Sequence, residues 1–137
     1  MTIDSTDQAI GEALAHVRPD PSEAARLLDK LYTDADRWPL DLRHRWFRAR
    51  AFVSSLLDDY IHAASLAKEA AELIPDAEAW LTCGMYAREV GLNELVERAV
   101  HEVHRIGGLD AEDQRTLDCL EAALRQASGN ESPEGEG

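Results

Sequence analysis

Proline, glycine and aspartate interrupt this sequence at short intervals, and these helix start and stop signals constrain the fold more than any other feature. Between the breaks, apolar residues recur every three or four positions, as in Ala24, Leu28 and Leu31. That spacing places side chains on one face of an α-helix. No segment alternates apolar and polar residues between turn dipeptides, as half-buried strands do. The pattern therefore predicts an all-α protein.

Start and stop signals divide the chain into seven predicted helices. The starts are Ser5 with Gln8, Asp20 with Pro21, Pro39, Asp58 with Asp59, Asp76, Asn93 and Asp110 with Asp113. The stops include Pro19, Pro75, Gly91, the pair Gly107 and Gly108, and finally Gly129. The third helix is expected to run to about Leu57, with Trp46, Ala49, Val53 and Leu57 facing inward. Because the connections are short, consecutive helices are expected to be antiparallel.

Length and composition indicate one globular domain. The chain has 137 residues, of which 45% are hydrophobic and 30% charged, values typical of a single soluble domain. We predict that residues 1–128 form this domain. The last nine residues, 129–137, are polar and acidic, so we predict a disordered tail there.

The net charge excludes some classes of partner. Asp and Glu number 27 against 14 Lys and Arg, which gives −13 at neutral pH, so nucleic acid and anionic membranes would be repelled. The start, Met1 to Gln8, has no apolar core of a secretory signal, and no apolar run approaches a membrane span. We therefore expect a cytoplasmic protein. Lys30 and Lys68 are the only lysines beside 12 arginines, which we interpret as the coding bias of a GC-rich bacterial genome.

Several positions recur at an interval of 33 or 34 residues. Trp46 precedes Trp80 by 34, and the alanines at 63, 67 and 70 precede the valines at 96, 100 and 103 by 33. Together with Gly84, Gly91 and Ala99, this stretch resembles the tetratricopeptide repeat, a helix pair in a 34-residue unit. The resemblance covers about residues 6–107, in which Ile10 to Leu31 form a third copy.

The resemblance implies a short right-handed superhelix of about three antiparallel helix pairs, with the seventh helix as a polar-faced C-terminal cap. Two features depart from the family pattern. Gly84 is the only glycine at its position among the three copies, and the link before the third helix is about five residues too long for such a unit. The alternative is an ordinary seven-helix bundle without repeat geometry.

Five of the arginines lie between Arg37 and Arg50, in an otherwise acidic chain. The first helix of each tetratricopeptide pair lines a concave groove, so the resemblance places Arg45 and Arg48 there. Guanidinium groups bind carboxylates bidentately and stack on aromatic rings. The expected groove residues are Arg45, Arg48, Phe52, Leu81, Met85 and Arg88. The alternative is that the arginines only neutralise nearby acidic residues on the surface.

These features lead us to expect a non-enzymatic protein–protein interaction module, such as an adaptor, a chaperone or a regulatory subunit. It would hold an acidic peptide segment or C-terminus of a protein partner in the groove, and it needs no cofactor. The acidic tail, residues 129–137, could occupy the same groove until a partner displaces it. The alternative is a structural homo-oligomer, such as a homodimer, that pairs through edge helices and takes no separate ligand.

Arg50 stands at a position that is normally apolar or small in such a helix. A buried guanidinium needs a paired carboxylate, so we expect Arg50 to form a salt bridge within the chain. The alternative is that Arg50 contacts a ligand.

The remaining reactive residues form no catalytic motif. His101 and His104, one turn after Glu97, are expected to be a surface pair, because no further metal ligand stands at a suitable spacing. Cys83 and Cys119 have apolar neighbours at helical spacing and are expected to be buried, inert thiols. We therefore expect no enzyme and no metal; the alternative is a small enzyme or metal-dependent regulator built on these histidines and one cysteine.

Overall fold

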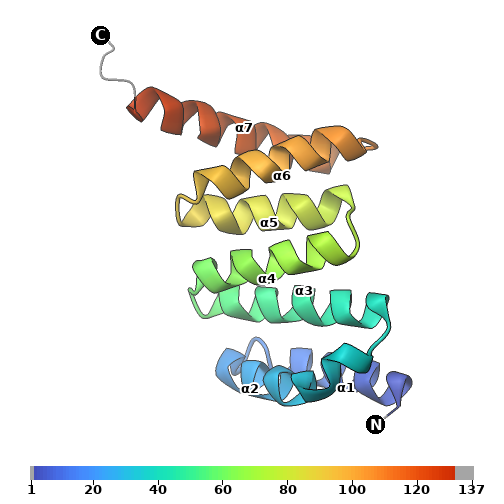
Figure 1. The fold of residues 1–137 in the computed structure, drawn as a ribbon. Coiled ribbons are helices and arrows are strands. Elements are labelled where there is room, and N and C mark those ends of the chain that lie inside the picture. Colours follow the sequence, from blue (N-terminus) through green and yellow to red (C-terminus); the bar gives the residue numbers. More distant parts are fainter. Residues whose placement is uncertain (1, 132–137) are drawn as a thin grey trace.

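The computed structural model describes residues 2–131, and helices account for most of them (Figure 1). The α-helices are α1 (Ile3–Ala15), α2 (Pro21–Leu31), α3 (Leu40–Leu56), α4 (Tyr60–Leu73), α5 (Ala77–Glu89), α6 (Asn93–Ile106) and α7 (Ala111–Glu131). The described part of the chain contains no strand, so the all-α prediction is confirmed. None of its helices has the length and apolar character needed to cross a membrane.

Aspartate side chains begin four of the helices, as the sequence predicts. The carboxylates of Asp20, Asp59, Asp76 and Asp110 each accept a hydrogen bond from the backbone N–H three residues later, at 2.8–3.2 Å. Each bond satisfies one of the N–H groups that a helix leaves without a partner at its first turn. These boundaries were predictable because the capping carboxylate and the N–H that donates to it lie within one turn of each other.

Three predicted boundary features are wrong. The first helix begins at Ile3 rather than near Ser5, because the hydroxyl of Thr2 accepts the N–H of Ser5 and caps the helix earlier. Leu57 is 40% exposed instead of inward-facing, because α3 ends at Leu56 and the chain then turns through Asp58 with φ of 59°. Helix α7 does not end at Gly129 but continues to Glu131. The rest of the predicted tail, residues 132–137, lies outside the described residues.

The helices stack in chain order as antiparallel neighbours, from α1 and α2 at one end to α7 at the other (Figure 1). Each helix packs against the next, and α1 also contacts α3 while α5 contacts α7. Helix α7 buries Leu117 and Leu120 and exposes Gln114, Arg115 and Asp118. The C-terminal end of the stack therefore has a polar outer face.

The core consists of two clusters along the stack. The N-terminal cluster surrounds Trp46 and includes Ile10 and Leu28, whereas the C-terminal cluster surrounds Trp80 and extends to α7. Leu66 of α4 packs against both. Packing therefore passes from neighbour to neighbour along the chain instead of converging on one centre.

The long link before α3 contains a short 3-10 helix, η1 (Tyr32–Arg37), that the sequence analysis did not predict. The ring of Tyr32 lies 4.2 Å from that of Trp46, 5.8 Å from Phe47 and 6.3 Å from Trp38, measured between centroids. These aromatic contacts hold η1 against Trp38, just before α3, and against the first half of that helix.

Candidate functional site

A hollow of about 450 Å³ lies between α3 and α5, with α4 beneath it. It is lined by His44, Arg45, Arg48, Ala49, Ala51 and Phe52 of α3, Ala67 and Ala70 of α4, Ala79, Thr82 and Tyr86 of α5, and Leu14 of α1. We call it the α3–α5 hollow. Its five alanines have no side-chain atoms beyond Cβ, so they leave room above the helices that carry them.

Arg45 lies at the α1 side of the hollow. Its Nη1 donates to the carboxylate of Asp7 and, at 2.8 Å, to the backbone carbonyl of the same residue. The side chain is still 40% exposed. The contact with Asp7 orients the guanidinium. Since exposed ion pairs contribute only about 0–1 kcal/mol, another carboxylate can replace that of Asp7 at little cost in free energy.

Arg48 lies at the α5 side of the hollow. Its Nη2 donates to the carboxylate of Glu78 at 2.6 Å, and the arginine side chain is 42% exposed. A guanidinium has five N–H donors, and this ion pair uses one of them. Both arginines are thus positioned by α1 and α5 while their charged groups remain accessible.

His44 and Tyr86 complete the lining, and the sequence analysis did not identify either. The Nδ1 of buried His44 lies 2.7 Å from the carbonyl oxygen of Ala70; because a carbonyl only accepts, this nitrogen carries the proton. Burial raises the pKa of half-buried Tyr86, against a smaller lowering by its hydrogen bond with Ser55, so its hydroxyl stays protonated. Tyr86 could have been found from the sequence, because Glu78, Thr82 and Tyr86 recur every four residues and therefore lie on one face of α5.

The structure brings three of the six predicted groove residues together. Arg45, Arg48 and Phe52 line the hollow. Leu81 is only 4% exposed and belongs to the core around Trp80. Met85 is half-buried against the same core, and Arg88 is exposed on α5 without lining the hollow.

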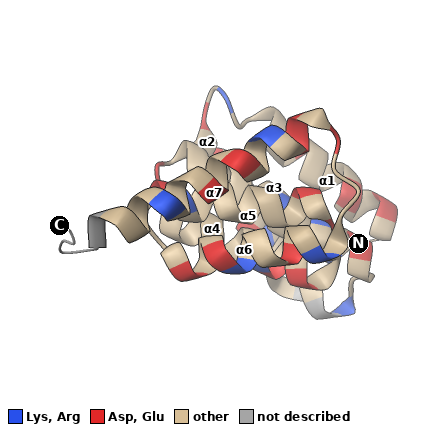
Figure 2. Ribbon diagram, turned by 90° about the horizontal axis from the view of Figure 1, so that it is seen from above, with Lys and Arg blue, Asp and Glu red and all other residues tan. Residues whose placement is uncertain are grey.

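The basic positions of the chain lie close to acidic ones on several helices (Figure 2). Besides the two pairs at the hollow, Arg98 binds Glu72 between α6 and α4 at 3.0 Å, and Arg105 binds Glu102 at 2.6 Å. Ion pairs with acidic residues are therefore not confined to the arginines of the hollow, and what distinguishes Arg45 and Arg48 is the space between them.

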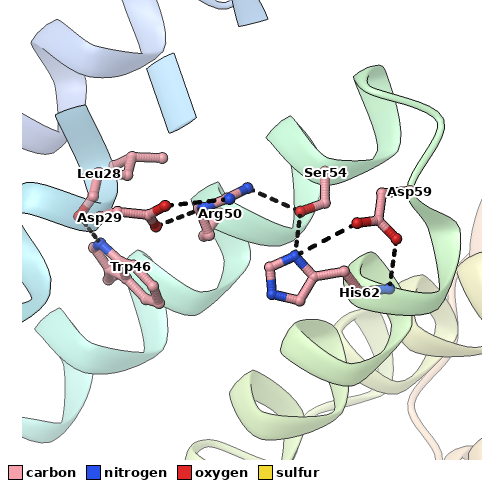
Figure 3. A network of polar contacts seen from close by, with 7 residues as sticks. All are labelled: Leu28, Asp29, Trp46, Arg50, Ser54, Asp59 and His62. Atoms are coloured by element: carbon pink, nitrogen blue, oxygen red, sulfur yellow. Dashed lines mark hydrogen bonds and ion pairs between the residues drawn. The ribbon is translucent and has the colours of Figure 1, made fainter. Parts of the chain in front are cut away.

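Arg50 forms the salt bridge that the sequence predicts (Figure 3). It is 9% exposed, and its Nε and Nη2 donate to the carboxylate of Asp29 on α2 at 2.8 and 3.4 Å. Its Nη1 donates to the hydroxyl of Ser54 at 2.9 Å, and that oxygen lies 3.1 Å from Nδ1 of His62 on α4. The chain of contacts joins α2, α3 and α4.

This network is not a nucleophilic triad. Ser54 is buried, and Asp59 lies 3.9 Å from the same Nδ1 of His62 that contacts the serine. A triad requires the serine and the carboxylate to bind opposite ring nitrogens. The arrangement is structural.

The other histidines and the cysteines are not gathered into a site. His104 binds Glu121 across α6 and α7 at 3.0 Å, and the described residues hold no group of three His, Cys, Asp or Glu side chains suited to a metal ion. Burial raises the pKa of the Cys83 thiol to about 12, which makes it inert. Cys119 is only partly buried, so the expectation of a buried thiol is wrong for that residue.

No protein-family model and no curated protein matches this sequence.

Proposed function

We propose that this chain is a non-enzymatic protein–protein interaction module that holds an acidic peptide segment or C-terminus of a partner in the α3–α5 hollow. The observation that carries the proposal is that Arg45, Arg48 and Phe52 line the same hollow. The stacking of antiparallel neighbours, with further contacts between α1 and α3 and between α5 and α7, supports a tetratricopeptide-like right-handed superhelix as its scaffold.

Binding would use the guanidinium donors. A carboxylate of the partner takes the free N–H groups of Arg45 and Arg48 or replaces Asp7 and Glu78, whose exposed pairs are weak. Charge-assisted bonds of this kind are about twice as strong as neutral ones. The five alanines of the α3–α5 hollow leave space for the partner's backbone, and Phe52 and Tyr86 supply apolar contact.

The first experiment selects peptides on the immobilised chain from a random display library and measures their affinities by fluorescence anisotropy. We expect enrichment of Asp and Glu, and loss of at least tenfold in affinity, about 1.4 kcal/mol, in the double variant R45E/R48E. The matched control is R26E/R105E, since both arginines are exposed and paired with a glutamate away from the hollow. Equal affinities in all three proteins would refute the proposal.

A second variant tests the exchange of carboxylates. D7N/E78Q removes the two negative charges that face the arginines, so acidic peptides should bind more tightly than to the unmodified chain, with the gain largest at low salt. Weaker binding would mean that the two carboxylates themselves belong to the recognised surface.

Self-association is the second candidate, favoured by one observation at the N-terminal end. A cleft of about 880 Å³ opens there between α1, α2 and η1, and its lining includes Ile3, Leu31 and Trp38. Charged residues, including Glu12, Lys30 and Arg37, alternate with these apolar ones. The terminal helix pair of such a stack exposes a face that a further repeat would cover, and a second copy of the chain could cover it instead. Light scattering over a range of concentrations separates a dimer from a monomeric module.

A further inference from the structure

One face of α3 changes from basic to apolar along its length. Arg45, Arg48, Phe52 and Leu56 follow one another at intervals of three and four residues, which places them in one row. The arginines lie in the first half of the helix, whereas Phe52 and Leu56 lie near its end and are 40% and 43% exposed. Two large apolar side chains in water beside a basic pair make an amphipathic surface.

Helix α5 changes from acidic to apolar along its length. Glu78, Thr82 and Tyr86 recur every four residues, and the exposed Val90, four positions further on, follows the last residue of the helix. Glu78 pairs with Arg48, and Tyr86 lines the hollow together with Phe52. Because α3 and α5 are each antiparallel to α4, they run in the same direction (Figure 1). The charged ends of the two rows, basic on α3 and acidic on α5, therefore lie beside each other, and so do their apolar ends.

From these coincident rows we infer that the surface between α3 and α5 binds an extended segment of a partner protein through two anchors. A carboxylate side chain lies at Arg45 and Arg48, and a bulky apolar side chain of the same segment lies at Phe52 and Leu56. The inference rests on the proposed function and adds to it the second anchor, the spacing and the conformation of the segment.

The distance between the anchors sets the number of residues that an extended segment places between them. The centres of the two residue pairs are between seven and eight positions apart on α3, which at 1.5 Å per residue is about 11 Å. An extended segment covers about 11 Å in three to four residues. A helical segment would need about seven to eight residues for the same distance, so the number of residues between the two anchors distinguishes an extended segment from a helical one.

The test uses the full chain and labelled synthetic peptides with two glutamates and one tryptophan in a Ser/Gly background. The tryptophan stands one, three, four or seven positions from the nearer glutamate, in both orders, and affinity is measured by fluorescence anisotropy. We expect the tightest binding at three or four positions, by about tenfold over the peptide without tryptophan. F52S/L56S should abolish this gain and keep the dependence on glutamate.

The matched control is I61S/L92S, which removes two exposed apolar side chains that lie outside both rows; it should bind as the unmodified chain does. Circular dichroism verifies that all variants fold. Equal affinity with and without tryptophan, or an optimum at one or seven positions, overturns the inference and leaves the proposed function standing. Loss of all dependence on glutamate in the unmodified chain overturns the proposed function itself.

Discussion

At the scale of single residues, Arg50 shows how a charge is accommodated inside a helix pair. A guanidinium at an apolar position requires a carboxylate, so the existence of its ion pair could be predicted from sequence. The identity of the partner could not, because Asp29 lies on α2 and reaches Arg50 only through the packing of α2 on α3. The local sequence pattern shows that Arg50 requires a carboxylate partner, and tertiary packing determines that this partner is Asp29.

Removing Asp29 should therefore cost more than removing the charge of Arg50. We expect D29A to lower the free energy of unfolding by about 1–3 kcal/mol, below the full cost for a buried pair because Asp29 itself is exposed. R50M, which fills the same space without charge, should cost less. Urea denaturation followed by circular dichroism measures both, with E97A as a surface control. A larger loss in R50M than in D29A would contradict this account.

The two cysteines should differ in reactivity. Since burial raises the pKa of Cys83 to about 12, roughly one thiol in ten thousand is ionised at pH 8, and the thiolate is the reactive form. We expect a disulfide reagent to modify only Cys119 in the folded protein and both cysteines in urea. The variant C119S should show no reaction when folded. Two equally fast reactions in the native chain would refute the difference.

The residues that sequence reasoning missed at the hollow have a common cause. His44 and Tyr86 lie 42 positions apart in the chain, and they meet at one hollow because α4 spaces α3 from α5. Arg45, Arg48 and Phe52 were identified because they stand on one helix at helical spacing. Leu81 was wrongly predicted to line the groove, because its position on the helix alone does not show whether the side chain faces the groove or the core.

At the scale of helices, local chemistry predicts most of the starts and fails where contacts are distant. Asp20 and Asp76 cap the helices that they precede, so the residues around the first turn of each helix are enough to predict where it starts. The 3-10 helix η1 depends on the contact of Tyr32 with Trp46, 14 positions further along the chain. Nothing within its own six residues predicts that contact.

Two glycines within helices provide a test of close packing. A Cβ added at Gly84 on α5 would lie 2.7 Å from Cδ1 of Leu120 and 3.2 Å from the Cβ of Ala99, whereas one at Gly11 on α1 would meet only Arg45, at 3.6 Å. We expect G84A to lower the free energy of unfolding by about 1–3 kcal/mol through overpacking. G11A should raise it by about 0.5–1 kcal/mol through helix propensity.

Thermal and urea unfolding of the two variants measure these changes. Each serves as the control for the other, because the substitution is the same and only the space around the glycine differs. A stabilising G84A would show that Leu120 can move aside without loss of packing.

At the scale of the whole molecule, the two core clusters predict unequal local stability. Helices α4, α5 and α6 are packed on both sides, whereas α1 and α2 cover one end of the stack and border the cleft of about 880 Å³. Amides of elements with fewer packed neighbours open more often. We expect faster hydrogen exchange in α1 and α2 than in α4 to α6, as measured by mass spectrometry. Uniform protection along the chain would contradict a neighbour-to-neighbour stack.

The buried face of α4 consists of alanines at positions 63, 64, 67, 70 and 71, beside the partly buried Leu66, so few large side chains fix the position of this helix along its axis. A row of methyl groups has little relief, so it opposes sliding of α4 along α3 only weakly. Two ties oppose such sliding, one from His44 to the carbonyl of Ala70 and one between Ser54 and His62, about 15 Å apart along α3. Loss of the second tie, as in H62L, would let α4 shift lengthwise and carry Ala67 with it. The depth of the hollow would then change although none of its lining residues had been altered.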